Sequence, residues 1–327
     1  MKYKFIVLAL LFQSAYAFSQ YAPAAGKTGS SALYMDSSIF KNWAKHCTIS
    51  RGWKNCQQKD SGYTSIGESN SACGKAGTNG VVSLGDSGSA ICQFIYPIKN
   101  GKGYDFAVFE NTFDDRFLEL AFVEVSSDGE HFFRFQSHSL TNTATQTSAF
   151  GYTEPENINN LAGKYRYGYG TPFDLNELPD TTLLNKNNIL YVKIVDVVGS
   201  INPSFASYDS ASNIINDPWP TPFASGGFDL DAIGVIHQQP ANVNIPKLNE
   251  SRIEGPNPIS EHQKLVIYNE DAQVSTLKIY NTHGQIVYSN LSSQLLIEIE
   301  AINLPLGLFY IELRGHRKFS NYRGIKL

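Results

Sequence analysis

Short runs of alternating hydrophobic and polar residues follow one another through the middle of the chain and predict β-strands rather than helices. β-Branched and aromatic residues dominate these runs, and Gly, Asn and Asp separate them. The alternation is clearest between Glu119 and Val125. Many strands with few helices predict an all-β fold, an antiparallel β-sandwich of jelly-roll type. The strand-like runs span residues 81–84, 90–98, 104–110, 117–127, 131–137, 189–199 and 228–236.

Two local signals refine this picture. The sequence SSDG at 126–129 predicts a hairpin turn, because Asp-Gly readily supplies the positive φ that a tight turn requires. Asp36 or Ser37 can cap a short helix that continues to Ala44 with its apolar residues on one face. We expect this to be the main helix of the chain.

The hydrophobic pattern loosens in two places. Residues 137–191 are rich in Asn, Thr and Gly, and long loops on a rigid sandwich are where binding sites usually lie. Residues 239–252 have the composition of a linker. We therefore expect a main β-sandwich domain over residues 21–238 and a separate C-terminal domain over residues 253–327.

The C-terminal segment predicts a small immunoglobulin-like β-sandwich. Period-two strands occupy residues 264–268, 275–281, 285–289, 296–302 and 308–314, and THGQ at 282–285 marks a turn between them. The PNP at 256–258, the KIYNTHGQIVY hairpin, INLPLGLFYIELR and the basic end RGIKL resemble the type A C-terminal sorting domain of the type IX secretion system. The resemblance implies export across the outer membrane of a Bacteroidota-type bacterium and contact with that secretion machinery. It also implies that the tail is commonly removed after export.

The first residues fit the same destination. Lys2 and Lys4 precede an apolar run from Phe5 to Phe12, and AYA at 15–17 has the small-x-small pattern of a cleavage site. We expect residues 1–20 to be a signal peptide cut near residues 17–20. The protein is then secreted or attached to the outer membrane and cell surface.

Composition and charge exclude several function classes. Hydrophobic residues make up 42% of the 327 residues, enough for a real core, and the net charge is −4. An acidic balance without Lys or Arg runs argues against nucleic acid as a partner. No later stretch is long and apolar enough to be a transmembrane helix.

The four cysteines all lie in the first third of the chain and predict disulfides in an exported protein. Three pairings are possible, and short loops favour Cys47–Cys56 with Cys73–Cys92. Zinc is the alternative, but no CxxC pair occurs.

One motif resembles the nucleophile segment of trypsin-like serine proteases. It is GDSG at 85–88, and His46 would have to serve as the base. The two are too close in sequence for the first of the two barrels that such a protease requires, so we interpret GDSG as a turn.

Acidic residues at predicted strand ends suggest a calcium site. In strand alternation Asp229 and Asp231 share one face, and oxygen-only clusters suit Ca²⁺. The alternative is that these are separate carboxylates of turns and surfaces. The predicted ligands of one structural Ca²⁺ are Glu110, Asp196, Asp217, Asp229 and Asp231.

Carboxylates also raise the possibility of glycoside hydrolysis. Glu119 and Glu124 lie on opposite faces by strand parity and do not form a pair. Glu110 with Asp229 or Asp231 could form one.

Aromatic residues in the loops suggest a surface for stacking on sugars or other flat ligands, although Tyr in Gly-rich loops also packs loops onto sheets. The candidate ligand-binding residues are Tyr165, Tyr167, Tyr169 and Trp219.

The main domain resembles a family of bacterial cell-surface proteins through DFAVFEN, LAFVEVSSDG, NLAGKY, GTPFDL, DPWPT and GGFDLDAIGV. The family has no settled activity, and this chain has Thr112 where Gly is expected after FEN. Three functions stay open: a module that binds a glycan or another envelope ligand, a carbohydrate-active hydrolase, and a structural or adhesive protein.

Overall fold

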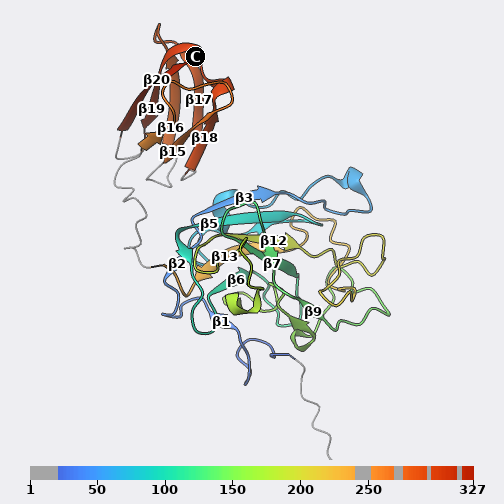
Figure 1. Ribbon diagram of the computed structural model, residues 1–327. Coiled ribbons are helices and arrows are strands. Elements are labelled where there is room, and N and C mark those ends of the chain that lie inside the picture. The colour runs from blue at the N-terminus through green and yellow to red at the C-terminus, as the bar shows by residue number, and fades with distance from the viewer. Residues whose placement is uncertain (1–20, 240–251, 269–274, 293–295, 315–318) are drawn as a thin grey trace, which may run out of the picture.

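The structure is a computed structural model that describes residues 21–239, 252–268, 275–292, 296–314 and 319–327 (Figure 1). The predicted signal peptide and nearly all of the predicted linker lie outside these ranges. The described residues are all-β, as predicted: their helical segments are short 3₁₀ turns. No helix in these ranges is long and apolar enough to cross a membrane. The 3₁₀ turns are η1 (Lys59–Ser61), η2 (Ser69–Ala72), η3 (Pro155–Asn157), η4 (Leu175–Glu177) and η5 (Ala301–Asn303).

Two antiparallel sheets form the main domain. The first has the order β1-β11-β6-β13-β2, with β4 also paired to β13, and the second has the order β3-β5-β12-β7-β8. A short ribbon joins β9 (His138–Ser139) and β10 (Ile158–Asn159). The first sheet comprises β1 (Leu33–Tyr34), β2 (Asn42–Trp43), β4 (Val82–Ser83), β6 (Phe106–Glu110), β11 (Tyr169–Phe173) and β13 (Asp229–Val235). The second comprises β3 (His46–Ser50), β5 (Ser89–Ile98), β7 (Ala121–Ser126), β8 (Phe133–Arg134) and β12 (Ile189–Asp196).

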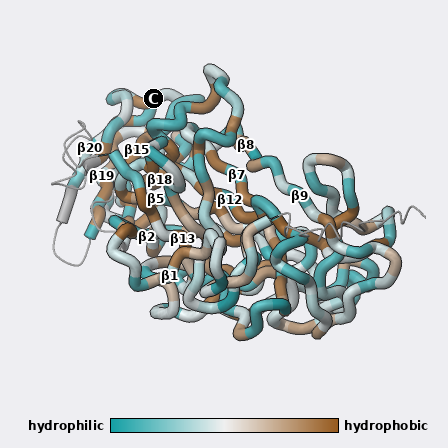
Figure 2. Tube along the Cα trace, turned by 90° about the horizontal axis from the view of Figure 1, so that it is seen from below, coloured by the Kyte–Doolittle hydropathy of each residue, from teal (hydrophilic) through white to brown (hydrophobic). Residues whose placement is uncertain are grey.

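The core lies between these two sheets. Phe106 and Val108 of β6 join Val123, Val192 and Ile194 of the opposite sheet in one buried cluster. In Figure 2 the hydrophobic positions follow the strands, whereas the loops around them are largely hydrophilic. The hydrophobic effect at this interface therefore holds the sandwich together.

The predicted hairpin at residues 126–129 is confirmed. β7 and β8 pair antiparallel with Val125 opposite Phe133, and Gly129 has φ +84°. The GDSG segment is the turn that the sequence predicts, since the Gly88 amide donates to the Gly85 carbonyl at 2.7 Å. On the sheet surface Glu124 pairs with Arg134 at 2.6 Å.

The predicted helix over residues 36–44 is wrong. The segment consists of turns followed by β2, which pairs with β13. The rings of Phe40 and Trp43 cover Phe109 on the outer face of the first sheet, with centroids 5.5 and 5.4 Å away. Apolar spacing that suits a helix here serves a strap across a sheet face.

A β-bulge in β13 changes the predicted alternation of FDLDAIGV. Leu230 lies opposite Glu110, the register shifts, and Ala232 lies opposite Phe109. Leu230 joins the core between the sheets, whereas Ala232 packs with Phe109 in the outer cluster. The strand is thereby re-aimed next to its acidic residues.

The C-terminal unit has two antiparallel sheets around its own core, as the strand pattern predicts. The turn at residues 282–285 is confirmed, with Gly284 at φ +74°. The smaller sheet has the order β14 (Arg252–Glu254), β15 (Lys264–Tyr268), β18 (Leu296–Glu300). The larger has the order β17 (Ile286–Ser292), β16 (Ser275–Asn281), β19 (Gly307–Arg314), β20 (Phe319–Lys326).

Cysteine pairing differs from the prediction. Cys47 of β3 lies directly opposite Cys92 of β5, with Cα atoms 4.1 Å apart, and the two form a disulfide. Cys56 and Cys73 are free thiols. Loop length was therefore the wrong guide, because strand pairing places Cys92 beside Cys47 across 45 residues of sequence.

Candidate functional site

The topology gathers acidic residues at one end of the main domain. Because the strands are antiparallel, β6 and β12 end where β5, β7 and β13 begin. Thus Glu110 and Asp196 at strand ends come near Asp229 at a strand start. Seven carboxyl groups of this end are at most 8% exposed: Asp86, Glu110, Glu119, Asp196, Asp217, Asp229 and Asp231.

Three of the predicted calcium ligands use their oxygens to hold the backbone. Asp196 accepts hydrogen bonds from the amides of Ser87 at 3.1 Å and Phe228 at 2.7 Å. Asp217 accepts from the Leu120 amide at 3.0 Å. Both oxygens of Asp231 accept from one backbone amide, that of Gly77, at 3.0 and 2.9 Å. These carboxylates fix the loops at the acidic end.

The other two predicted ligands retain free oxygens. Glu110 Oε2 accepts from the Thr112 amide at 2.9 Å, but Glu110 Oε1 is buried without a hydrogen-bond partner. Asp229 Oδ1 is likewise unpartnered, and so are the hydroxyls of Ser83 and Thr112. Ser83 is the register partner of Asp229. Burial raises the pKa of Asp229, but the side chains of Ser83 and Asn111 lie close enough to oppose that rise by hydrogen bonding. Buried polar atoms are rarely left unpaired, so Glu110 Oε1 and the Thr112 hydroxyl mark a place that a ligand can complete.

A pocket of about 210 Å³ opens beside these atoms. Asp229 and Glu119 supply its two carboxyl groups, and Asn111 and Thr112 of the loop after β6 line it beside them. Ala149, Thr221 and Ser225 also line the pocket. Three different loops contribute four phenylalanines to it: Phe113, Phe117, Phe150 and Phe223. We call these four the aromatic rim.

The aromatic rim is unusually exposed. Phe113 is 85% and Phe150 72% exposed, although large apolar side chains normally avoid water. Phe150 stacks on Phe117 and Phe223 with centroids 6.5 and 5.7 Å away. A contiguous exposed apolar patch of this kind marks a site that binds something.

Burial governs the protonation of the three acids at the base of the pocket, Glu110, Glu119 and Asp229, which we call the floor. It raises the pKa of Glu110 and of Glu119 well above the usual range, and the mutual repulsion of these carboxylates adds to the shift. Burial also raises the pKa of Asp229 to about 6. Carboxyl groups with raised pKa values in a pocket are the groups that can donate or accept protons or bind a cation.

The predicted aromatic ligands fall in different places. Tyr167 does not line the pocket but lies next to it, since its ring is 5.7 Å from that of Phe113 and its amide donates to the Thr112 carbonyl. Tyr169 packs against Tyr34 with centroids 5.4 Å apart. Tyr165 and Trp219 are buried: Tyr165 is hydrogen-bonded to Ser31, and Trp219 Nε1 donates to Asp86 at 3.2 Å.

Calcium binding stays a prediction. Within the described ranges, no three His, Cys, Asp or Glu side chains come together in a geometry that could hold a metal ion. Ca²⁺ takes six to eight oxygen ligands. Of the five predicted carboxylates, Glu110 and Asp229 have buried oxygens without a hydrogen-bond partner.

Sequence reasoning missed Glu119 and the aromatic rim. Strand parity excludes a pair of Glu119 with Glu124 and reveals no other partner for Glu119, and the Gly-rich loops direct attention to Tyr and Trp. The signal for the rim was a lone Phe in polar loops, as in ENTFDD, SAFGY and TPFASGG, where no strand is available to bury it.

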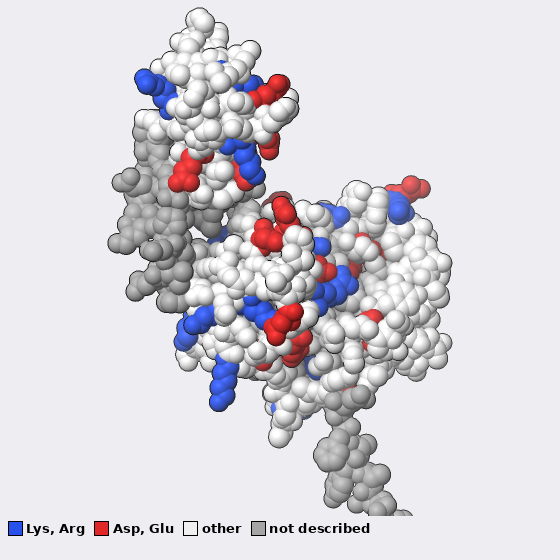
Figure 3. Space-filling model, in the orientation of Figure 1, with Lys and Arg blue, Asp and Glu red and all other residues white. Residues whose placement is uncertain are grey.

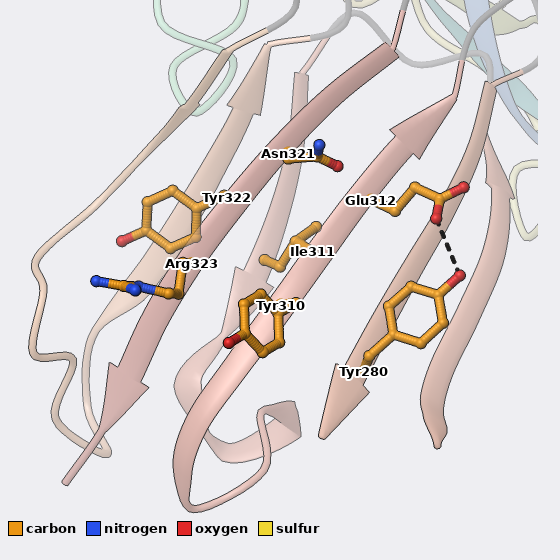
Figure 4. A pocket seen from close by; sticks show the side chains of 7 residues that line it. All are labelled: Tyr280, Tyr310, Ile311, Glu312, Asn321, Tyr322 and Arg323. Atoms are coloured by element: carbon orange, nitrogen blue, oxygen red, sulfur yellow. Dashed lines mark hydrogen bonds between the residues drawn. The ribbon is translucent and has the colours of Figure 1, made fainter. Parts of the chain in front are cut away.

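A second hollow lies on the C-terminal unit, over β16, β19 and β20 (Figure 4). The Tyr280 hydroxyl donates to Glu312 at 3.0 Å, and Tyr310 lies beside Arg323 of the next strand. The carboxylate of this hollow is already hydrogen-bonded and it lies on a sheet surface. We therefore place the candidate ligand site in the main domain. Elsewhere on the face seen in Figure 3, acidic and basic side chains are intermingled.

Comparison with known proteins leaves the family open. No protein-family model and no curated protein matches the chain. Among solved structures, a β-glucuronidase from Ruminococcus gnavus in complex with a C6-substituted uronic isofagomine is 9% identical, with a TM-score of 0.24, over 90% of this chain and 47% of that one. PorZ, a surface component of the type IX secretion system of Porphyromonas gingivalis, is 11% identical with a TM-score of 0.23, over 82% and 41%. The chain spans less than half the length of these proteins, and likeness at this level carries no functional argument.

Proposed function

We propose that this protein is exported by the type IX secretion system and that its main domain binds a carbohydrate of the cell envelope or surroundings. The observation that carries the binding proposal is the pocket itself. Two carboxyl groups and unpartnered buried oxygens lie beneath exposed phenylalanines, which is a polar floor under an apolar rim. Sugars present both matching surfaces, hydroxyl donors for carboxylates and C–H faces for aromatic rings.

Replacement of Phe150 by alanine is expected to weaken oligosaccharide binding about fivefold, as loss of one stacking ring costs about 1 kcal/mol. Isothermal titration with ligands found on a glycan array measures this. Tyr104→Ala is the matched control, since Tyr104 is a half-exposed aromatic residue that precedes the opposite end of β6. Equal losses in both variants, or no glycan bound by the unaltered chain, would contradict the proposal.

A hydrolase is the second candidate because Glu119 and Asp229 line one pocket and burial raises the pKa of both. The same oligosaccharides decide between the two. Release of new reducing ends that Glu119→Gln abolishes would assign turnover, whereas unchanged ligand after long incubation leaves binding as the function.

The export part of the proposal rests on the leader pattern and on the resemblance of residues 253–327 to a type A sorting domain. In a bacterium with a type IX system, the full chain is expected at the surface or in the medium. A chain ending at Gln238 is expected to stay in the periplasm. Fractionation and immunoblotting measure the distribution, and a fluorescent reporter fused to residues 239–327 tests sufficiency. Surface delivery of the shortened chain would contradict the assignment.

A further inference from the structure

The ionisable residues that line the pocket are all acidic. Its lining contains two acids, Glu119 and Asp229, and no Lys, Arg or His. Glu110, Asp196 and Asp217 are close enough to Glu119 to raise its pKa, and Asp231 acts in the same way on Glu110. One cation, the Arg51 guanidinium, acts in the opposite direction on Asp229. Arg51 donates to the carbonyls of Ile66 and Ser83 at 2.7 Å each, so its hydrogen-bonding groups are engaged with backbone.

The unpartnered oxygens of the acidic residues also indicate a ligand that carries hydrogen-bond donors. Glu110 is 1% exposed and Asp229 is 7% exposed. One carboxyl oxygen of each, Glu110 Oε1 and Asp229 Oδ1, has no hydrogen-bond partner. Carboxylate oxygens only accept hydrogen bonds. Asp229 lines the pocket, and with a pKa of about 6 it is ionised at neutral pH, so the ligand group that reaches it is a donor. An ammonium group offers three donors with no acceptor.

The aromatic rim selects the kind of cation. Aromatic faces attract an organic ammonium within about 6 Å, and phenylalanine has no polar atom with which to ligate a metal ion. Ca²⁺ takes six to eight oxygen ligands, whereas the aromatic rings contribute none to this pocket. The pocket thus combines an apolar rim with an acidic floor whose Asp229 carries a negative charge at neutral pH, which suits an amine carried on a partly apolar body.

We propose that the pocket recognises an amino sugar with a free amine, in preference to its N-acetylated or acidic counterparts. This inference rests on the carbohydrate-binding function proposed above. The ammonium reaches the floor formed by Glu119 and Asp229, with Glu110 behind them. The C–H face of the sugar lies against Phe150 and its neighbours. An acetylated nitrogen loses its charge, and a uronic acid brings a carboxylate into a pocket that already holds several.

The test titrates the full chain with tetramers of glucosamine, of N-acetylglucosamine and of galacturonic acid. The free amine is expected to bind at least about tenfold more tightly than the acetylated tetramer, and the acidic tetramer most weakly. Asp229→Asn, which keeps the side-chain shape without the charge, is expected to abolish the tighter binding of the free amine. Phe113→Ala, at an 85% exposed position that the fold does not need, is expected to weaken binding of the free-amine tetramer. Tyr104→Ala is expected to change neither.

The outcomes separate the two proposals. Equal affinity for the amine and its acetylated form overturns the amine preference and leaves carbohydrate binding in place. No binding of any tetramer, together with a glycan array without hits, removes the carbohydrate-binding function itself. Calcium alone is titrated as a further probe: if Ca²⁺ binds and Asp229→Asn abolishes that binding, the pocket is a metal site and the amine proposal is wrong.

Discussion

Replacement of both Cys47 and Cys92 by alanine is expected to lower the free energy of unfolding of the main domain by about 3–4 kcal/mol. The disulfide closes a loop across 45 residues of sequence, and cross-linking a loop of this size removes much of the conformational freedom of the unfolded chain. It also joins β3 to β5 at the edge of the second sheet. Denaturant unfolding followed by tryptophan fluorescence, with and without reductant, measures the loss.

The other two cysteines provide the control. Cys56 is half-buried and free, so Cys56→Ala is expected to change the free energy of unfolding by less than about 1 kcal/mol. Reductant is expected to destabilise this variant by the same amount as the unaltered protein. Burial raises the pKa of the Cys56 thiol to about 12, and this keeps it protonated and unreactive at neutral pH. If Cys56→Ala destabilised the protein as much as the double replacement, the pairing of Cys47 with Cys92 would be wrong.

The disulfide illustrates what pattern reading can and cannot supply. Even cysteine count and export predict a disulfide, but the pairing depends on which strands are neighbours. The segment that became β3 was not predicted as a strand, because its sequence HCTIS is short and half-exposed. Without β3 opposite β5, the local pairings looked best.

Another missed strand was β11, which falls in the stretch predicted to be loop. Its sequence YGTPF contains Gly170 and Pro172, both unfavourable in strands. Tertiary packing overrides this preference: a Cβ on Gly170 would lie 2.8 Å from the Phe109 ring. Glycine is needed there so that the strand can approach its neighbour, and no local pattern reveals that.

The acidic end was half predicted. Strand ends correctly indicated that Glu110 and Asp229 lie together, since antiparallel neighbours end and begin at one edge. Which carboxylates remain free could not be predicted. Asp196 accepts from two backbone amides and Asp217 from one, and only the folded chain brings those amides to them.

Neutralising Asp229 is expected to stabilise the main domain at pH 8 by about 2–3 kcal/mol while removing ligand binding. The carboxyl has a pKa of about 6 in the folded protein and 3.8 as its ordinary value. A raised folded-state pKa means that the folded protein holds the proton more tightly, so this contribution to stability is full below about pH 4 and lost as pH rises through 6. A shift of this size corresponds to about 3 kcal/mol. Asp229→Asn keeps the shape without the charge, and chemical denaturation at pH 5 and pH 8 measures its effect.

The difference between variant and unaltered chain isolates this residue from opposing groups. His46 has a lowered pKa because of burial, and it therefore acts in the opposite direction as pH falls, but it is common to both proteins. Asp209→Asn is the matched control. Partial burial acts to raise the pKa of Asp209, yet hydrogen bonds from Asn213, Ser139 and Ala211 hold it below its ordinary value. Asparagine at position 209 is expected to destabilise the protein, because it replaces one of the two carboxylate oxygens that accept hydrogen bonds from the amides of Ser139, Ala211 and Asn213.

Opposite signs at Asp229 and Asp209 would distinguish a carboxylate kept for a ligand from one kept for the fold. Asp229 is expected to lower the stability of the folded chain at pH 8, and one of its oxygens is unpaired, so folding alone does not explain its presence. Folding does not explain the aromatic rim either, since the exposed Phe113 and Phe150 contribute little to the core. If Asp229→Asn destabilised the chain equally at pH 5 and pH 8, the carboxylate would be a structural acceptor like Asp209. The pocket would then contain no free carboxylate for its proposed ligand at this position.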